Sequence, residues 1–490
     1  MGKNESKGEF YIFVNNKLSN IISLRFIFSI VASLFTTLCC YSQIMYDQYV
    51  NPGYAKIKSV RFRPVEKTRI SAWLIAIGPA KGDSLSTPVI PLVGENKGLE
   101  LDFDILEDDI RSLSFRIIHC DRYWRKSNLV ESEYIKIKDE DFLFDGDAAE
   151  PSYSTTVPYV NYNRAFPVSG AQVPNFTFLL SGNYILQVYD NGVIYNREND
   201  EDSEEFSEEY VESDEIILFQ KRFVVTEQLV EIQADVIRPN LVQYMDDSQQ
   251  ITMKIIPHGF DLSTFDKDLF VVYQQNGRWD KIISGIKPNH VSGDGTLVFN
   301  DNRNAIFQGG NEFHNFNFKN LRIATAPVDF IGKKDGKYTV LLHPDNDWHA
   351  AYTPTTDLNG KFLIQDDNNP GIYEGASADY AEVKFTLKYH RNLYDTLDVY
   401  VFGGFNNWKL TDENKMTYNE EKQQYEATIL LKQGYYNYKY VKASADFKTI
   451  DEIGIDGSFY QTENEYEIFV YFYDYAQGYD RCIGYKKIKN

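Results

Sequence analysis

Apolar and polar residues alternate along several short stretches of the chain, and this period of two constrains the fold more than any other feature. Leu99, Leu101 and Phe103 alternate with Glu100, Asp102 and Asp104. The same period recurs around residues 113–117, 251–255 and 383–387. Successive side chains of a strand point to opposite faces, so the pattern predicts antiparallel strands with one wet face.

Aromatic residues support an all-β fold. The chain has 36 Tyr and 33 Phe but only 5 Met, and bulky aromatic side chains favour pleated, half-buried surfaces. Asn276–Gly277 and Asp335–Gly336 stand beside apolar runs, as expected of hairpin turns. We therefore predict an all-β, multi-domain protein built from immunoglobulin-like β-sandwiches in tandem.

The 490 residues are enough for two to four domains at roughly 100–200 residues each. A strand pattern ends near Thr226, and residues 366–378 are rich in Asp, Asn, Gly and Pro, as in a loop or linker. These features predict an N-terminal β-domain over residues 50–226, a middle β-domain over 227–376 and a C-terminal immunoglobulin-like β-domain over 380–490.

The N-terminus has the pattern of a secretory signal peptide over residues 1–42. An apolar stretch follows Arg25, and Ser42 precedes the expected cleavage point. Two alternatives stay open: a transmembrane anchor, for which the stretch is short, and a lipoprotein signal ending at Cys39 or Cys40. Cleavage leaves Cys120 and Cys482, which we interpret as buried small hydrophobic residues rather than a disulfide framework.

The net charge is −21 and the pI about 4.8, which argues against nucleic acid and anionic lipid as partners. A well-solvated acidic surface is the simple interpretation, and a basic protein partner is also compatible. Residues 198–215 hold eleven carboxylates among eighteen residues. This acidic insertion predicts a hairpin tip, because like charges repel; the alternative is a calcium site, although the run contains no Gly.

Motifs that carry chemistry are scarce. The chain lacks GxGxxG, the phosphate-binding GxxxxGK[ST], HExxH and GxSxG. His343 and His349 flank two aspartates in a turn-rich segment, and His119–Cys120–Asp121 follows a strand pattern. Neighbouring strand residues point to opposite faces and cannot easily assist each other. We predict no catalytic residue, no cofactor and no metal, with an unrecognised hydrolase as an open alternative.

Residues 399–408, Val-Tyr-Val-Phe-Gly-Gly-Phe-Asn-Asn-Trp, form the most specific local pattern. They resemble the early-set immunoglobulin-like modules that include starch- and glycogen-binding domains. That resemblance makes Trp408, with Phe405, a candidate platform for a sugar ring and gives an alternative function as a carbohydrate-binding envelope protein. The other interpretation is that these rings only hold strands of the sandwich together.

Several segments, taken in order, resemble the plug protein family of the type IX secretion system from about residue 57 to the C-terminus. They are 115–121 with Trp124, 132–134, 181–184, 275–280, 309–313, 357–360, 399–408, 416–421, 432–438 and 457–464. The resemblance implies a periplasmic protein that closes the inner mouth of the large outer-membrane translocon barrel when no cargo passes. It implies no catalytic residue, no membrane insertion of the mature chain, and a monomer in a 1:1 complex with the barrel.

Overall fold

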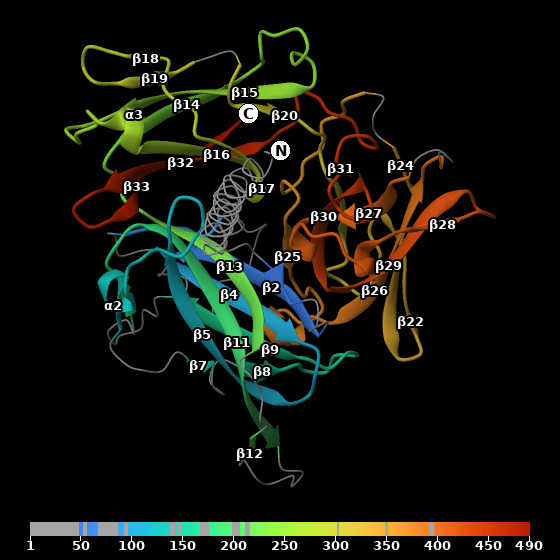
Figure 1. The fold of residues 1–490 in the computed structure, drawn as a ribbon. Coiled ribbons are helices and arrows are strands. Elements are labelled where there is room, and N and C mark those ends of the chain that lie inside the picture. Colours follow the sequence, from blue (N-terminus) through green and yellow to red (C-terminus); the bar gives the residue numbers. More distant parts are fainter. Residues whose placement is uncertain are drawn as a thin grey trace, which may run out of the picture.

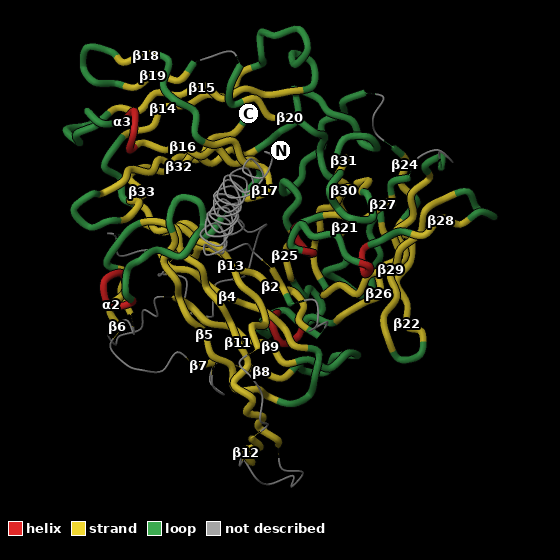
Figure 2. The backbone as a smooth tube through the Cα atoms, in the orientation of Figure 1, coloured by secondary structure: helices red, strands yellow, loops and turns green. Residues whose placement is uncertain are grey.

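The computed structural model describes residues 49–51, 56–66, 87–92, 97–137, 143–144, 149–166, 176–197, 206–210, 216–300, 303–347, 351–391 and 396–490. The predicted signal peptide, residues 1–42, lies outside them, as does the acidic run 198–215 except for residues 206–210. Strands dominate these residues, and the helices are single turns (Figure 2). The all-β prediction is confirmed.

The first domain packs two main sheets over one core. One sheet has the order β1-β13-β11-β5-β7, with β12 beside β11 and β3 beside β13; the other has the order β2-β4-β9-β8. The strands are β1 (Tyr49–Val50), β2 (Ile57–Glu66), β3 (Val89–Pro91), β4 (Lys97–Ile105), β5 (Ile110–Cys120), β7 (Leu143–Phe144), β8 (Ala149–Pro151), β9 (Val160–Phe166), β11 (Gly182–Arg197), β12 (Phe206–Tyr210) and β13 (Ile216–Thr226). Helix α2 (Glu131–Tyr134) and the pair β6 (Ile135–Ile137) and β10 (Phe176–Phe178) complete it.

The second domain is a sandwich assembled from two distant parts of the chain. Its sheets have the orders β14-β15-β19-β18, with β20 beside β15, and β17-β16-β32-β33. The elements are β14 (Glu231–Ile237), β15 (Ser248–Ile256), α3 (Phe265–Asp268), β16 (Leu269–Gln275), β17 (Arg278–Ser284), β18 (His290–Val291), β19 (Leu297–Phe299), β20 (Ile306–Gln308), β32 (Glu465–Asp474) and β33 (Tyr479–Lys489). In Figure 1 the red strands β32 and β33 lie beside β16.

The third domain occupies the chain between these two parts. One sheet has the order β22-β23-β26-β29-β28, with β24 beside β26, and faces strands that pair around β30. The elements are β21 (His314–Asn317), β22 (Val328–Lys334), β23 (Lys337–Leu342), β24 (Asp345–Asn346), β25 (Phe362–Ile364), α4 (Glu374–Ser377), β26 (Tyr380–Lys388), β27 (Asp398–Phe402), η4 (Gly404–Asn406), η5 (Asp412–Asn414), β28 (Thr417–Asn419), β29 (Gln424–Lys432), β30 (Gly434–Ala443) and β31 (Ile450–Asp451).

Strand pairing therefore groups the residues differently from the expected ranges 227–376 and 380–490. The parallel pair β23–β26 spans the expected boundary, and β16 pairs along its whole length with β32. The third domain is inserted into the second. After it, strands β32 and β33 complete the sheet that β16 and β17 began. The turn-rich segment 366–378 is a loop inside the third domain that includes α4.

Each sandwich has its own hydrophobic core, formed largely by the alternating apolar residues that the sequence analysis identified. Leu99, Leu101 and Phe103 lie in the first core, Ile251, Met253 and Ile255 in the second, and Val383, Phe385 and Leu387 in the third. Both predicted hairpin turns are present. Asn276–Gly277 joins β16 to β17 and Asp335–Gly336 joins β22 to β23, all four residues having positive φ angles.

Candidate functional site: the junctions between the domains

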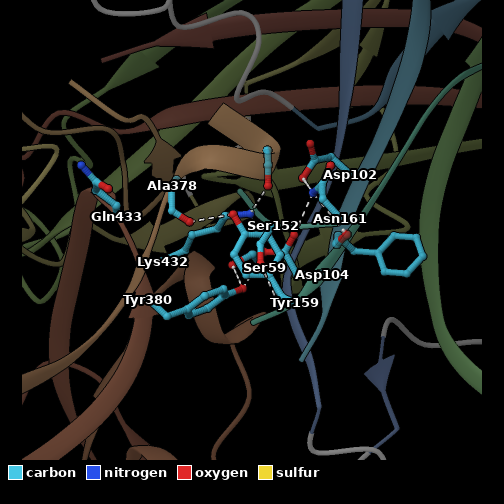
Figure 3. Close-up of polar contacts among 12 residues, drawn as sticks. Ser59, Asp102, Asp104, Ser152, Tyr159, Asn161, Ala378, Tyr380, Lys432 and Gln433 are labelled. Atoms are coloured by element: carbon cyan, nitrogen blue, oxygen red, sulfur yellow. Dashed lines mark hydrogen bonds and ion pairs between the residues drawn. The ribbon is translucent and has the colours of Figure 1, made fainter. Parts of the chain in front are cut away.

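A cluster of buried polar side chains lies between the first and third domains (Figure 3). Asp104 on β4 accepts hydrogen bonds from Lys432 Nζ at 2.7 Å and from Tyr380 Oη at 2.6 Å. Both charged side chains of this pair are fully buried. Asp102, two residues earlier on the same face of β4, pairs with Arg61 at 2.6 Å and accepts a hydrogen bond from Tyr373 at 2.7 Å. The pair of Asp104 with Lys432 thus joins β4 to the third domain, whereas the pair of Asp102 with Arg61 lies within the first domain and is linked to the third through Tyr373.

This cluster corrects one sequence-based expectation. Asp102 and Asp104 were expected on a wet strand face, but their exposed fractions are 1% and 0%. The third domain covers that face of β4 and supplies Lys432, Tyr373 and Tyr380 as partners. An alternating pattern shows which face of a strand is polar. It does not show that this face is exposed, because another domain can bury it by supplying complementary polar groups.

Burial and charge act in opposite directions on these groups. Burial raises the pKa of Asp102, but the charges of Arg61 and Lys432 outweigh it and hold that pKa well below its usual range. Burial raises the pKa of Asp104 and lowers the pKa of Lys432, so desolvation disfavours both charges of this pair. The pair is held by direct contact and by the ring of Tyr159, whose centroid lies 4.1 Å from Lys432 Nζ.

A second set of contacts surrounds the charge pairs. Asp379 accepts hydrogen bonds from the backbone and hydroxyl of Thr156, at 2.7 and 3.0 Å. Tyr159 Oη donates to the carbonyl of Ala378 at 2.7 Å, and Ser59 lies 2.9 Å from Tyr380 Oη. These bonds connect the β2-β4-β9-β8 sheet and its loops to the start of β26. The first and third domains therefore share an extensive and specific polar interface.

The junction between the first and second domains is apolar. Its buried residues are Val89, Ile118, Cys120, Trp124, Ile185 and Val224 from the first domain, and Val272, Trp279, Phe469, Tyr471 and Cys482 from the second. The rings of Trp124 and Trp279 meet edge to face at 4.6 Å, and the guanidinium of Arg222 lies 4.6 Å from the ring of Trp124. The polar rim includes Arg122, which bonds Asp480 at 2.7 Å.

The junction between the second and third domains centres on Arg278 of β17. Its guanidinium donates to both carboxylate oxygens of Glu452, at 2.7 and 2.9 Å, and lies 4.4 Å from the ring of Trp408. Burial lowers the pKa of Arg278, but the carboxylates of Glu452 and Asp280 raise that pKa by more than burial lowers it. The guanidinium therefore stays charged. This arginine therefore makes a bidentate ion pair and a cation–π contact across the interface between the second and third domains.

Near the same junction, His314 at the start of β21 is buried between two carboxylates. Its Nε2 lies 3.1 Å from Asp456 and its Nδ1 3.4 Å from Asp345. Tyr438 and Tyr440 donate to the other oxygen of Asp345, at 2.6 and 2.7 Å. Burial alone lowers the pKa of His314, but Asp456 and Asp345 raise it to about 10. The imidazolium therefore holds the start of β21 against two carboxylates of the third domain.

Trp408 and Phe405, the proposed sugar platform, lie in this packed region. Besides Arg278, Trp408 contacts Phe402 and Phe313 edge to face, at 5.3 and 5.9 Å. Phe405 packs edge to face on Tyr436 at 5.8 Å. Gly360 has a positive φ of 79°, and a Cβ there would overlap Trp408. These contacts explain Trp408 as part of the domain junction and Phe405 as packing against the core of the third domain, and sugar binding stays a prediction.

The three neighbours His119, Cys120 and Asp121 are directed to separate environments. His119 lies among Tyr134, Tyr184 and Tyr479, and burial lowers its pKa to about 4. Cys120 is buried in the junction between the first and second domains, where burial raises the pKa of the thiol. Asp121 accepts hydrogen bonds from Tyr123 and Arg125. The geometry does not assemble a thiol nucleophile with its base.

The remaining chemical candidates stay apart as well. Cys482 is a free buried thiol on the opposite side of the same junction from Cys120. His343 is half exposed and lies 3.8 Å from Asp329, and His349 lies outside the described residues. Within the described ranges, no group of three or more His, Cys, Asp or Glu is placed to hold a metal. None of the helices in that part of the chain is long and apolar enough to cross a membrane.

The junction residues that the sequence analysis missed carry no local signature. Asp104 and Lys432 are 328 positions apart, and Arg278 and Glu452 are 174 apart. The sequence offered one weaker indication of these residues, namely ionisable side chains within strongly apolar strands. Asp102 and Asp104, which alternate with Leu101, Phe103 and Ile105, are an example. Such residues are seldom fully buried unless they are paired.

The comparison with protein families identifies a relative for one part of this architecture. Residues 57–199, most of the first domain, match the model of the type 9 secretion system plug protein 1st domain. This part of the chain is therefore similar to the first domain of type IX secretion plug proteins. The match covers β2 to β11, which includes Asp102, Asp104 and the segment His119–Asp121.

A solved structure resembles this chain over nearly its whole length. A hypothetical protein from Parabacteroides merdae ATCC 43184, determined at 2.30 Å resolution, is 28% identical with a TM-score of 0.74. The alignment covers 91% of this chain and all of that one. No curated protein matches the chain. That structure is therefore similar to this chain across all three domains.

Proposed function

We propose that this protein is a non-enzymatic periplasmic plug. It binds the periplasmic mouth of the outer-membrane type IX translocon barrel and seals it while no cargo is in transit. The observation that carries the proposal is the match of residues 57–199 to the first domain of type 9 secretion plug proteins. The apolar stretch and cleavage pattern of residues 1–42 support export to the periplasm.

The architecture supports a sealing role on physical grounds. A body that closes a wide pore must resist deformation, and here each domain contacts the other two through buried side chains. The junctions combine an apolar cluster with charge pairs that depend on precise geometry. A hinge motion at any junction would leave a buried charge unpaired, which is strongly unfavourable. The three sandwiches therefore form one stiff plug.

The test is affinity isolation of the tagged protein from gently solubilised envelopes, followed by mass spectrometry. We expect a very large outer-membrane barrel to be recovered at about one copy per plug, with more recovered when secretion is slowed. A matching physiological test compares wild-type and deletion cells for entry of a dye that the intact outer membrane excludes. Unchanged dye entry in the deletion strain, together with no recovered barrel after mild crosslinking, would refute the proposal.

A further inference from the structure

The chain crosses twice between the second and third domains, and the two crossings lie against each other. It leaves the second domain after β20 through residues 309–313 and returns before β32 through residues 457–464. The carbonyl of Gly310 accepts hydrogen bonds from the amide of Phe459 and the hydroxyl of Thr462, both at 2.8 Å. We call residues 309–313 and 457–464 the paired crossings. Because they connect the two domains covalently, their packing against each other affects how far these domains can move apart.

Two carboxyl groups meet at the paired crossings. Glu312 belongs to the outgoing crossing and has an exposed fraction of 3%, and Asp357 is half-buried in the loop before β25. A hydrogen bond joins the two side chains. Ionised carboxylates only accept hydrogen bonds, so this contact requires a proton on one of the two groups. The closed junction therefore holds a proton between Glu312 and Asp357.

Further hydrogen bonds fix the pair and connect it to both crossings. Glu312 Oε1 accepts a hydrogen bond from Tyr352 Oη at 2.7 Å and another from the backbone amide of Glu463, in the returning crossing, at 3.0 Å. Asp357 Oδ2 accepts a hydrogen bond from the backbone amide of Phe313 at 2.6 Å. The two carboxyl groups thus bond the outgoing crossing, the returning crossing and a loop of the third domain to one another.

The cations around the pair are engaged elsewhere. Three lysines bond other carboxylates: Lys489 with Glu463 at 3.5 Å, Lys361 with Glu465 at 2.7 Å and Lys439 with Glu452 at 3.5 Å. His314, two residues after Glu312, is directed to Asp456 and Asp345. Tyr352 and Tyr435 also face the pair, and burial raises the pKa of both, so they are neutral. In the described part of the chain, no ion pair includes Glu312 or Asp357.

This environment favours the protonated pair. Burial raises the pKa of Asp357 to about 7, against the hydrogen bonds from the amides of Phe313 and Asn359, and the negative charges of Glu312 and Glu463 act in the same direction as burial. Burial likewise raises the pKa of Glu312. If both groups ionise, two anions stand in contact in a site that supplies neither with a cation, which is unfavourable.

We propose that Glu312 and Asp357 form a proton-binding latch, which strengthens the junction of the second and third domains when it carries its proton and weakens that junction when the proton is lost. In an opened junction both carboxyl groups meet water and ionise near pH 4. The closed form is therefore favoured most at acidic pH, and this preference is lost as the pH rises from about 4 to about 7. The latch concerns the domains of this chain alone and does not depend on the proposed plug function.

The test compares full-length wild-type protein with Glu312→Gln by hydrogen–deuterium exchange of the paired crossings. The Gln oxygen can still accept the hydrogen bonds from Tyr352 and Glu463, and its amide can donate to Asp357 without a titrating proton. Because both proteins are measured at the same pH, their intrinsic exchange rates cancel. We expect equal exchange within about twofold at pH 5, and exchange about tenfold or more faster in the wild type at pH 8, as one unit of pKa corresponds to tenfold.

Glu382→Gln is the matched control, since Glu382 is an exposed carboxylate on β26 of the same domain. It should exchange like the wild type at both pH values. Asp357→Asn neutralises the other member of the pair and should also remove the difference between pH 5 and pH 8. If the crossings of Glu312→Gln exchange as the wild type does at pH 8, the latch is refuted. The same conclusion follows if Glu382→Gln slows exchange at pH 8 as much as Glu312→Gln does.

Discussion

At the residue scale, the pair formed by Lys432 and Asp104 carries the clearest consequence for stability. The two side chains are fully buried and 2.7 Å apart. Replacing Lys432 with Met leaves Asp104 desolvated without its cation. Removing one partner of a buried pair costs about 3–5 kcal/mol. We expect the free energy of unfolding, measured by urea titration, to fall by that amount for Lys432→Met.

Lys415 provides the control for this prediction. It pairs with Asp398 at the same distance of 2.7 Å, but both side chains are about 40% exposed. Exposed pairs contribute about 0–1 kcal/mol, so Lys415→Met should change little. A double variant, Lys432→Met with Asp104→Leu, removes both buried charges and should recover much of the loss. Equal losses for Lys432→Met and Lys415→Met would contradict this account of the junction.

His314 predicts a dependence of stability on pH. Burial lowers its pKa, but Asp456 and Asp345 raise the folded-state value to about 10, against about 6.5 in an unfolded chain. The folded state therefore binds the proton more tightly. This stabilisation is fully present below about pH 6.5 and is lost as the pH rises towards 10. Melting temperatures measured between pH 6 and 10 should fall along this range.

The variant His314→Gln isolates that contribution. Gln can keep a hydrogen bond to Asp456 but carries no charge, so the variant should be less stable at pH 6 and nearly as stable as wild type at pH 10. The difference between the two melting curves, rather than either curve alone, reports His314. A constant difference across the whole range would mean that His314 is neutral in the folded protein.

At the element scale, β32 and β33 decide whether the second domain can fold. Strand β16 pairs with β32 over seven residues, from Leu269 with Phe472 to Gln275 with Tyr466. Buried residues Tyr466, Ile468, Val470 and Ile483 complete the core of that sandwich. A protein that ends at residue 463 therefore lacks two of the four strands of one sheet.

We expect such a truncated chain to expose the second domain to proteolysis, while the core of the first stays protected. A complementary chain that omits residues 314–460 and closes the gap with a short flexible linker should keep the second domain folded. Limited proteolysis with mass spectrometry separates the two cases. Protection of residues 231–308 in the truncated chain would show that β32 and β33 are dispensable.

The sequence could predict elements whose interactions are local along the chain, but not those that depend on residues far apart in the sequence. Local rules found the alternating strands and the Asn276–Gly277 turn, because a two-residue hairpin requires positive φ angles that these residues tolerate. The return of β32 to β16 follows a separation of nearly two hundred residues, and no local pattern records it. Alternation also located the polar faces of β4 correctly but could not show that another domain would cover Asp104.

At the scale of the whole molecule, the three sandwiches form a closed triangle in which every domain touches the other two (Figure 1). The candidate sealing function depends on this closure more than on any single surface. Arg278 lies at the junction of the second and third domains, where it contacts both Glu452 and Trp408. A substitution there therefore tests whether this junction keeps the triangle of domains closed, with little damage to a hydrophobic core.

We expect Arg278→Lys to loosen that junction although the charge is kept. A lysine ammonium cannot make the two bonds to Glu452 and at the same time contact the ring of Trp408, as the larger planar guanidinium does. The predicted loss in the free energy of unfolding is about 1.5–3 kcal/mol, the range for hydrogen bonds to charged groups. Circular dichroism should be unchanged, because no strand is altered. Small-angle X-ray scattering should show a larger radius of gyration, because the third domain separates from the second, and barrel recovery should fall in parallel. A variant with the wild-type scattering curve would mean that the remaining junctions alone hold the triangle closed. Arg278 would then be a local contact rather than a determinant of the shape of the molecule.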